Sequence, residues 1–134
     1  MKNIALLLVI VGCFQIFSCS KDSQSEKFLL LTGPVWASDS LLLNGEDVSD
    51  PGELLENFKG DVIFHEDYTG NFGSYTGKWR FAFDETQLVI SSDSLPIPLT
   101  AIIAELTQSS LKITTSYTLS ATQTLNIRMT FKAK

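Results

Sequence analysis

The sequence predicts an all-β domain, an antiparallel up-and-down barrel of eight strands with one short helix after the first strand. From residue 36 onward, short segments alternate apolar and polar residues, which is the pattern of strands that bury one face. Turn-forming residues separate these segments, and strands joined by short turns are antiparallel neighbours. Eight such strands can close on themselves and leave no free edge, although the same pattern also allows a sandwich of two sheets.

The first strand is expected over residues 36–43, and it ends at an Asn-Gly dipeptide that is typical of tight hairpin turns. A short helix is expected next, over residues 50–58. Asp50 suits the N-cap of this helix, Pro51 suits its first position, and Glu53 completes a capping box. The sequence therefore places the helix of the domain between the first and second strands.

Seven further strands are expected at short intervals. Gly77 is predicted to separate the third strand from the fourth, in which Trp79, Phe81 and Phe83 share one face. The segment 99–107 would also suit a helix, but the Ser-Ser turn and the strand-like segment after it favour a strand. The expected ranges are 61–66, 71–76, 78–83, 87–91, 99–107, 111–118 and 122–132.

The first 18 residues are typical of a secretory signal peptide. One positive charge, on Lys2, precedes an unbroken apolar run over residues 4–11. This run is too short for a membrane-spanning helix, which needs about 20 apolar residues. We therefore expect residues 1–18 to be removed on export.

The residues before Cys19 supply what a lipoprotein signal requires. Ile16-Phe17-Ser18-Cys19 has an apolar residue at −3, a small residue at −1, and a thiol that takes the lipid. Cys13 ends a similar motif, but its leader would be very short and the segment after it is apolar. Residues 19–27 are polar and rich in serine, which predicts a flexible tether. We expect Cys19 to carry a lipid that anchors the chain to a membrane, and residues 28–134 to fold.

Short motifs follow the tether in a characteristic order. They are Leu31-Thr32-Gly33-Pro34-Val35-Trp36, Asn44-Gly45, Asp67-Tyr68-Thr69-Gly70 and Gly77-Lys78-Trp79-Arg80-Phe81. Together with the cysteine and the tether, this order resembles the lipocalin-like lipoproteins of Gram-negative bacteria. The resemblance covers residues 28–134 and implies a lipocalin-like barrel that binds a small apolar or glycan ligand in or at the barrel. It also implies the outer membrane, with the domain on the periplasmic face or at the cell surface.

Trp36 and Arg128 are the residues that the resemblance places at the end of the barrel. In lipocalins an arginine near the last strand packs over the tryptophan of the first strand and closes that end. A cation–π contact of this kind contributes about 0.5–2 kcal/mol. The alternation along residues 122–132 instead places Arg128 on the solvated face, so the sequence leaves both interpretations open.

Six aromatic residues are the candidate ligand-binding residues of the barrel. Aromatic side chains commonly line ligand pockets, and they also fill the interior of a small barrel. The first interpretation predicts a cavity and the second a filled core. The six residues are Phe64, Phe72, Tyr75, Trp79, Phe81 and Phe83.

Charge and motif content argue against several classes of function. The net charge of −5, which loss of Lys2 with the leader would make more negative, does not suit nucleic acid. His65 is the only histidine and the predicted domain has no cysteine beyond Cys19, so neither a metal nor another cofactor is predicted. The sequence has no nucleophile-elbow or phosphate-loop motif. We therefore expect a monomeric, non-catalytic ligand-binding lipoprotein, or alternatively a protein-interaction or accessory module of a cell-envelope complex with a filled barrel core.

Overall fold

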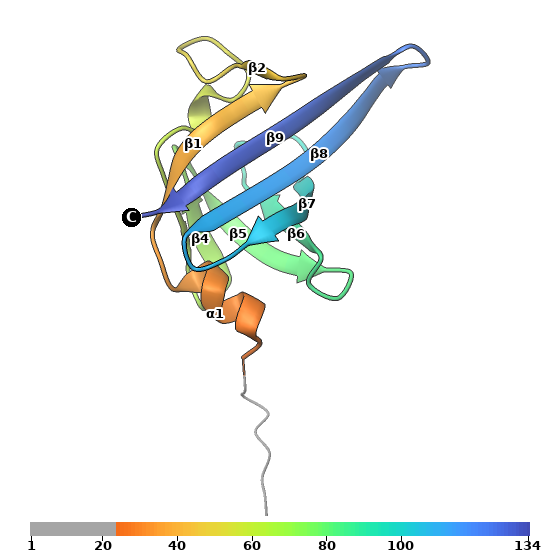
Figure 1. Ribbon diagram of the computed structural model, residues 1–134. Helices are drawn as coiled ribbons and strands as arrows, with labels where there is room; N and C mark the ends of the chain where they lie inside the picture. The colour runs from red at the N-terminus through yellow and green to blue at the C-terminus, as the bar shows by residue number, and fades with distance from the viewer. Residues whose placement is uncertain (1–23) are drawn as a thin grey trace, which may run out of the picture.

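The computed structural model describes residues 24–134 (Figure 1), so the predicted signal peptide, Cys19 and most of the predicted tether lie outside the described residues. Within this range one α-helix, α1 (Glu26–Thr32), precedes the strands. The strands are β1 (Trp36–Leu43), β2 (Glu46–Asp47), β3 (Asp61–Phe64), β4 (Thr69–Phe72), β5 (Tyr75–Ala82), β6 (Gln87–Ser91), β7 (Leu99–Leu106), β8 (Ser110–Ser120) and β9 (Gln123–Ala133).

Eight of these strands form a closed antiparallel barrel, which confirms the predicted fold class. From β3 to β9 each strand pairs with the next along the chain, and β1 pairs with β3 on one side. β9 returns to pair with β1 from the Trp36–Ala133 pair to the Leu43–Ile127 pair. β2 is a two-residue extension beside the end of β1. Because β1 and β9 close the ring, the alternative of two separate sheets is not formed.

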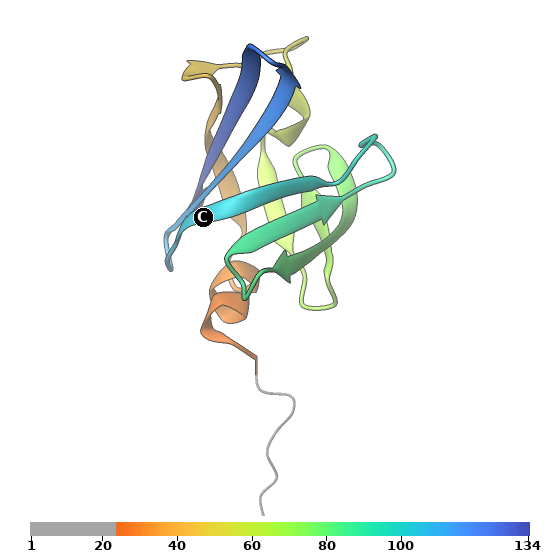
Figure 2. The same cartoon turned by 90° about the vertical axis from the view of Figure 1, so that its right-hand side faces the viewer.

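The short helix α1 covers one end of the barrel (Figures 1 and 2). Its N-terminus is capped by the Ser25 hydroxyl, which accepts a hydrogen bond from the backbone N–H of Phe28 at 3.1 Å. Phe28 and Leu31 lie three residues apart on one face and are buried. The sequence interpretation did not expect this helix and assigned its first two residues to the tether. A helix of seven residues is stabilised mainly by its tertiary packing. The pattern of so short a segment does not reveal that packing.

The prediction of an α-helix over residues 50–58 is wrong. The structure has turns there and one 3₁₀ turn, Glu56–Phe58. The capping interaction itself does form, because the Glu53 carboxylate accepts a hydrogen bond from the backbone N–H of Asp50 at 2.8 Å. Gly52, however, has a φ of +91°, and this left-handed backbone ends any helix that begins at the cap.

The sequence interpretation placed Gly73 within a strand and Gly77 between two strands, and the structure shows the reverse. The turn between β4 and β5 lies at Gly73, whose φ is +66°, and Gly77 lies within β5. A Cβ on Gly77 would overlap the carbonyl of Ser91 on β6. The predicted strand 71–76 is therefore wrong, because Gly77 allows close approach of two strands and does not end one.

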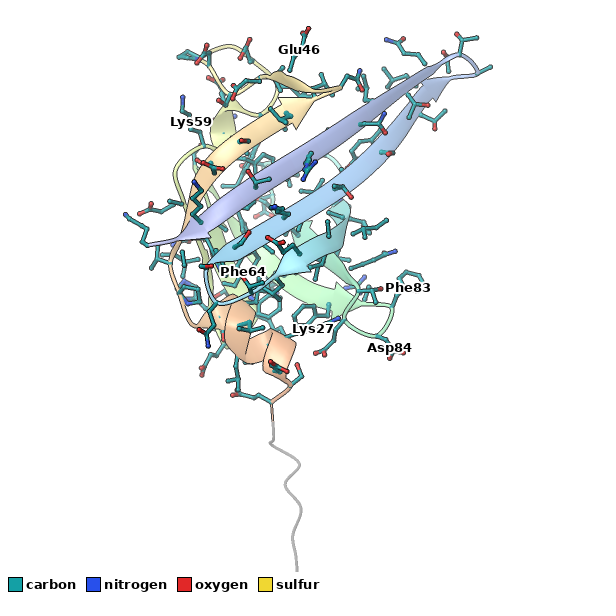
Figure 3. The ribbon with its side chains drawn as sticks, in the orientation of Figure 1. Lys27, Glu46, Lys59, Phe64, Phe83 and Asp84 are labelled. Carbon is teal, nitrogen blue, oxygen red and sulfur yellow. The ribbon has the colours of Figure 1, made fainter. Side chains whose placement is uncertain are left out.

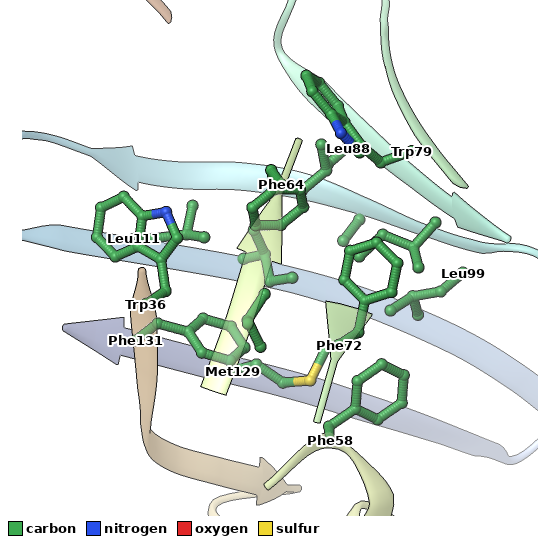
Figure 4. Close-up of a cluster of buried hydrophobic side chains, with 14 of the residues drawn as sticks. Trp36, Phe58, Phe64, Phe72, Trp79, Leu88, Leu99, Leu111, Met129 and Phe131 are labelled. Atoms are coloured by element: carbon green, nitrogen blue, oxygen red, sulfur yellow. The ribbon is translucent and has the colours of Figure 1, made fainter. Parts of the chain in front are cut away.

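Large side chains fill the interior of the barrel (Figure 4). They come from every strand of the ring and from α1, so the core is continuous from the helix-covered end to the opposite one. Burial of apolar side chains in such a core is the main source of stability in a domain of this size. The largest fully buried side chains are Trp36, Trp79, Phe64, Phe72, Leu31, Leu41, Leu88, Leu111, Ile113, Met129 and Val62.

The Gly77→Ala variant is expected to be less stable by about 1–3 kcal/mol, because β5 and β6 would have to separate to admit the new methyl group. Thr76→Ala, at the exposed neighbouring position, is the control and is expected to change the stability by less than about 0.5 kcal/mol. Urea denaturation of both variants measures the difference. Equal stability of the two variants would contradict the close approach of the strands.

Candidate functional site

Five of the six predicted aromatic residues lie at the barrel interior, and four of them form one packed cluster. The ring of Phe64 lies 5.4 Å from that of Phe72 and 5.6 Å from that of Trp79, in edge-to-face geometry. Phe81 extends the cluster with its ring 5.4 Å from Trp79 at 87°. Such edge-to-face pairs stabilise a core beyond the burial of their area, by about 0.5–1.5 kcal/mol each. The cluster is thus a rigid aromatic packing unit.

Two aromatic rings seal this cluster at the end that α1 covers. Phe28 of α1 and Tyr68 of the β3–β4 turn both pack on Trp79, with ring centroids 5.7 and 4.9 Å away. The indole N–H of Trp79 donates a hydrogen bond to the carbonyl of His65 at 3.0 Å. The sequence interpretation did not include Phe28 or Tyr68, because their roles depend on where α1 and the turn lie in space.

Tyr75 and Phe83 lie apart from the main cluster. Tyr75 is half-buried and packs against Phe58, with 4.9 Å between the ring centroids. Phe83 is 74% exposed and points away from the barrel (Figure 3), so the prediction that it shares the inner face with Trp79 is wrong. The reason is that β5 ends at Ala82, and Phe83 begins a turn in which three consecutive residues have positive φ.

The predicted closing contact between Trp36 and Arg128 is not formed. Trp36 lies inside the barrel and its Cα pairs with Ala133, whereas Arg128 is exposed and pairs with Leu42, near the other end of β1. Alternation along β9 points both neighbours of this arginine inward and the arginine outward. The indole N–H of Trp36 instead donates to the carbonyl of Leu31 at 3.0 Å, so α1 closes this end.

Four hollows lie on the outside of the barrel wall. Two of them adjoin on β1, β8 and β9, and Arg128 and Leu42 line both. Two others adjoin on β4, β5 and β6, where Lys78, Thr69 and Ser91 line both. Of these outward-facing residues only Arg128 was a candidate from the sequence, and there for closing the barrel, because strand positions of this kind look like ordinary solvated faces.

Hydrogen bonding lowers the pKa of two carboxyls that lie on or beside these outer faces. The Ser110 hydroxyl is the main cause of the lowered pKa of Glu105, and Lys112 and Arg128 contribute by their charge. The Thr69 hydroxyl similarly lowers the pKa of Asp67. Both carboxylates therefore stay ionised near neutral pH and are held by fixed partners.

Within residues 24–134, no cluster of three or more His, Cys, Asp or Glu side chains has the geometry of a metal site. No helix in the same part of the chain has the length and apolarity needed to cross a membrane. The amino-acid sequence matches no protein-family model and no curated protein.

The Phe72→Ala variant is expected to be less stable by about 3–5 kcal/mol, because it would leave a cavity in the packed core. Phe83→Ala is the matched control, since it removes the same ring from an exposed turn and is expected to change the stability by less than about 0.5 kcal/mol. Thermal unfolding followed by circular dichroism measures both. A Phe72→Ala variant as stable as the wild type would mean that this ring lines an open cavity.

Proposed function

We propose that this chain is a lipid-anchored, non-catalytic protein of the cell envelope that binds its partners on the outside of a filled barrel. The filled interior is the observation that supports binding on the outside. Trp36, Phe64 and Phe72 are at most 1% exposed, and they occupy the space that a ligand would need. An eight-stranded barrel has room for either side chains or one small ligand. Side chains take that room here, which favours an interaction or accessory module over a carrier of a small apolar molecule.

The lipid anchor is the second part of this proposal, and it rests on the sequence around Cys19. Gln24, the first described residue, precedes α1 and lies five positions after Cys19. A stretch of five residues spans at most about 18 Å. A lipid on Cys19 would therefore hold the α1 end of the barrel close to the membrane surface and leave the outer wall accessible. Three acyl chains, as in fully processed bacterial lipoproteins, would anchor the protein stably.

The proposed location is the outer membrane. Ser20 occupies the position after Cys19, where some Gram-negative bacteria use aspartate to retain lipoproteins in the inner membrane. The domain would then face the periplasm or the cell surface.

The Cys19→Ala variant is expected to lose the lipid and to leave the membrane fraction. Cys13→Ala is the matched control, since it removes a thiol that would be discarded with the signal peptide, and it is expected to behave as the wild type. Mass spectrometry of the N-terminal peptide and fractionation of cells in a Gram-negative host measure both effects. Acylation that survives in Cys19→Ala but not in Cys13→Ala would reassign the anchor.

The filled barrel is expected to carry no small molecule when it is purified from its host. Native mass spectrometry of the delipidated chain measures this directly, and the expected result is the mass of the polypeptide alone. A small molecule that stays bound to the wild type and is lost in Phe64→Ala would contradict a filled core. It would support the alternative that the barrel carries a small ligand inside.

A further inference from the structure

One part of the barrel wall, strands β5 to β9, carries more basic than acidic side chains, and we call it the basic wall. Although the chain has a net charge of −5, strands β5 to β9 contain a single carboxylate, Glu105. The other acidic side chains of the described residues lie on α1, on β1 to β3 and in the loops and turns, and Asp39 of β1 lines the hollow that Arg128 also lines. Five basic side chains lie on the same strands: Lys78, Arg80, Lys112, Arg128 and Lys132.

Arg128 has a central place on this basic wall. Its Cα pairs with Leu42 of β1 on one side and with Thr114 of β8 on the other. It lines both of the adjoining hollows on this face, which together form a trough across β1, β9 and β8. We call this the Arg128 trough; its lining also includes Asp39, Asn44, Lys112, Ser116, Asn126 and Lys132.

The guanidinium of Arg128 makes no ion pair within 4.0 Å among residues 24–134, although its charge also acts on the carboxylate of Glu105. The other two cations of the trough are paired. The Nζ of Lys132 lies 3.4 Å from a carboxylate oxygen of Asp39, and the Nζ of Lys112 lies 3.5 Å from one of Glu105. An exposed arginine in an acidic protein thus keeps its planar fork of donors available. Such a fork binds a carboxylate or a phosphate through two parallel hydrogen bonds.

Small polar groups, held in place by hydrogen bonds, line the second half of the trough. The Ser116 hydroxyl donates to the side-chain oxygen of Asn126 at 2.7 Å, and the backbone N–H of Asn126 donates to the side-chain oxygen of Asn44 at 2.9 Å. Hydroxyl and amide groups of this kind suit the hydroxyls of a sugar, which both donate and accept. Leu42, half-buried beside Arg128, supplies an apolar surface for the face of a sugar ring.

We propose that the Arg128 trough binds an acidic glycan, with the guanidinium of Arg128 holding an anionic group and the hydroxyl and amide side chains contacting the neighbouring sugar hydroxyls. The anionic group is a carboxylate, as on a uronic acid, or a phosphate ester, because the fork geometry accepts both. This inference rests on the proposed function, in which the barrel acts through its outer wall, and it names the class of partner.

Isothermal titration calorimetry tests the inference on the full lipidated chain in a neutral detergent at low ionic strength. The probes are an oligogalacturonate, a neutral malto-oligosaccharide of the same length, and inorganic phosphate. Saturable binding of oligogalacturonate but not of the neutral oligosaccharide is expected. Competition by inorganic phosphate would assign the site to either anion, and its absence would assign the site to carboxylated glycans.

Three variants separate a specific site from a general attraction of the basic wall. Arg128→Ala is expected to weaken binding of the oligogalacturonate about tenfold or more, because a charged hydrogen-bonding partner is lost. Arg128→Lys is expected to recover only part of the affinity, since an ammonium is a point charge. Arg80→Ala, an exposed arginine on β5 outside the trough, is the control and is expected to bind as the wild type.

The absence of saturable binding would overturn the inference, and so would an equal loss of affinity in Arg80→Ala and Arg128→Ala. Either result would leave the lipid anchor untouched, because membrane fractionation of Cys19→Ala is measured independently. If the wild-type chain carried no lipid but still bound the glycan, the missing lipid would contradict the anchor and the binding would support the trough.

Discussion

The pairing of β1 with β9 is the interaction on which the rest of the structure depends. It joins the first long strand to the last one, from Trp36 opposite Ala133 to Leu43 opposite Ile127. Without this pairing, one edge of β1 and one edge of β9 would be open. Closure turns eight half-buried strands into a wall around one core. α1 then completes the enclosure, because Trp36 at the start of β1 binds the last turn of the helix.

The closed wall surrounds a filled interior. Phe64, Phe72 and Trp79 pack edge to face in the interior, and Phe28 from α1 adds a further ring at the closed end. A core of interlocked rings has low compressibility and resists the entry of a ligand. Recognition is therefore proposed for the outer wall, whose side chains are free to differ as long as the inward positions remain apolar.

The distribution of charge gives that outer wall a character distinct from the rest of the surface. Acidic residues outside strands β5 to β9 keep the net charge negative, which favours solubility. Basic residues outnumber the single carboxylate on strands β5 to β9, and Lys112 and Lys132 are partly neutralised by Glu105 and Asp39. A rigid wall holds such groups at fixed spacing, which is what recognition of a repeating acidic polymer would require.

The sequence by itself determined the class of fold and the ranges of most strands. The alternation of apolar and polar residues also pointed Arg128 outward, because a strand sends neighbouring side chains to opposite faces. Only the tertiary structure decided between a filled and an open barrel, since aromatic residues suit both. It also placed α1 over one end, moved the β4–β5 turn to Gly73, and exposed Phe83. These features depend on contacts between residues far apart in the chain, and a local sequence pattern does not predict such contacts.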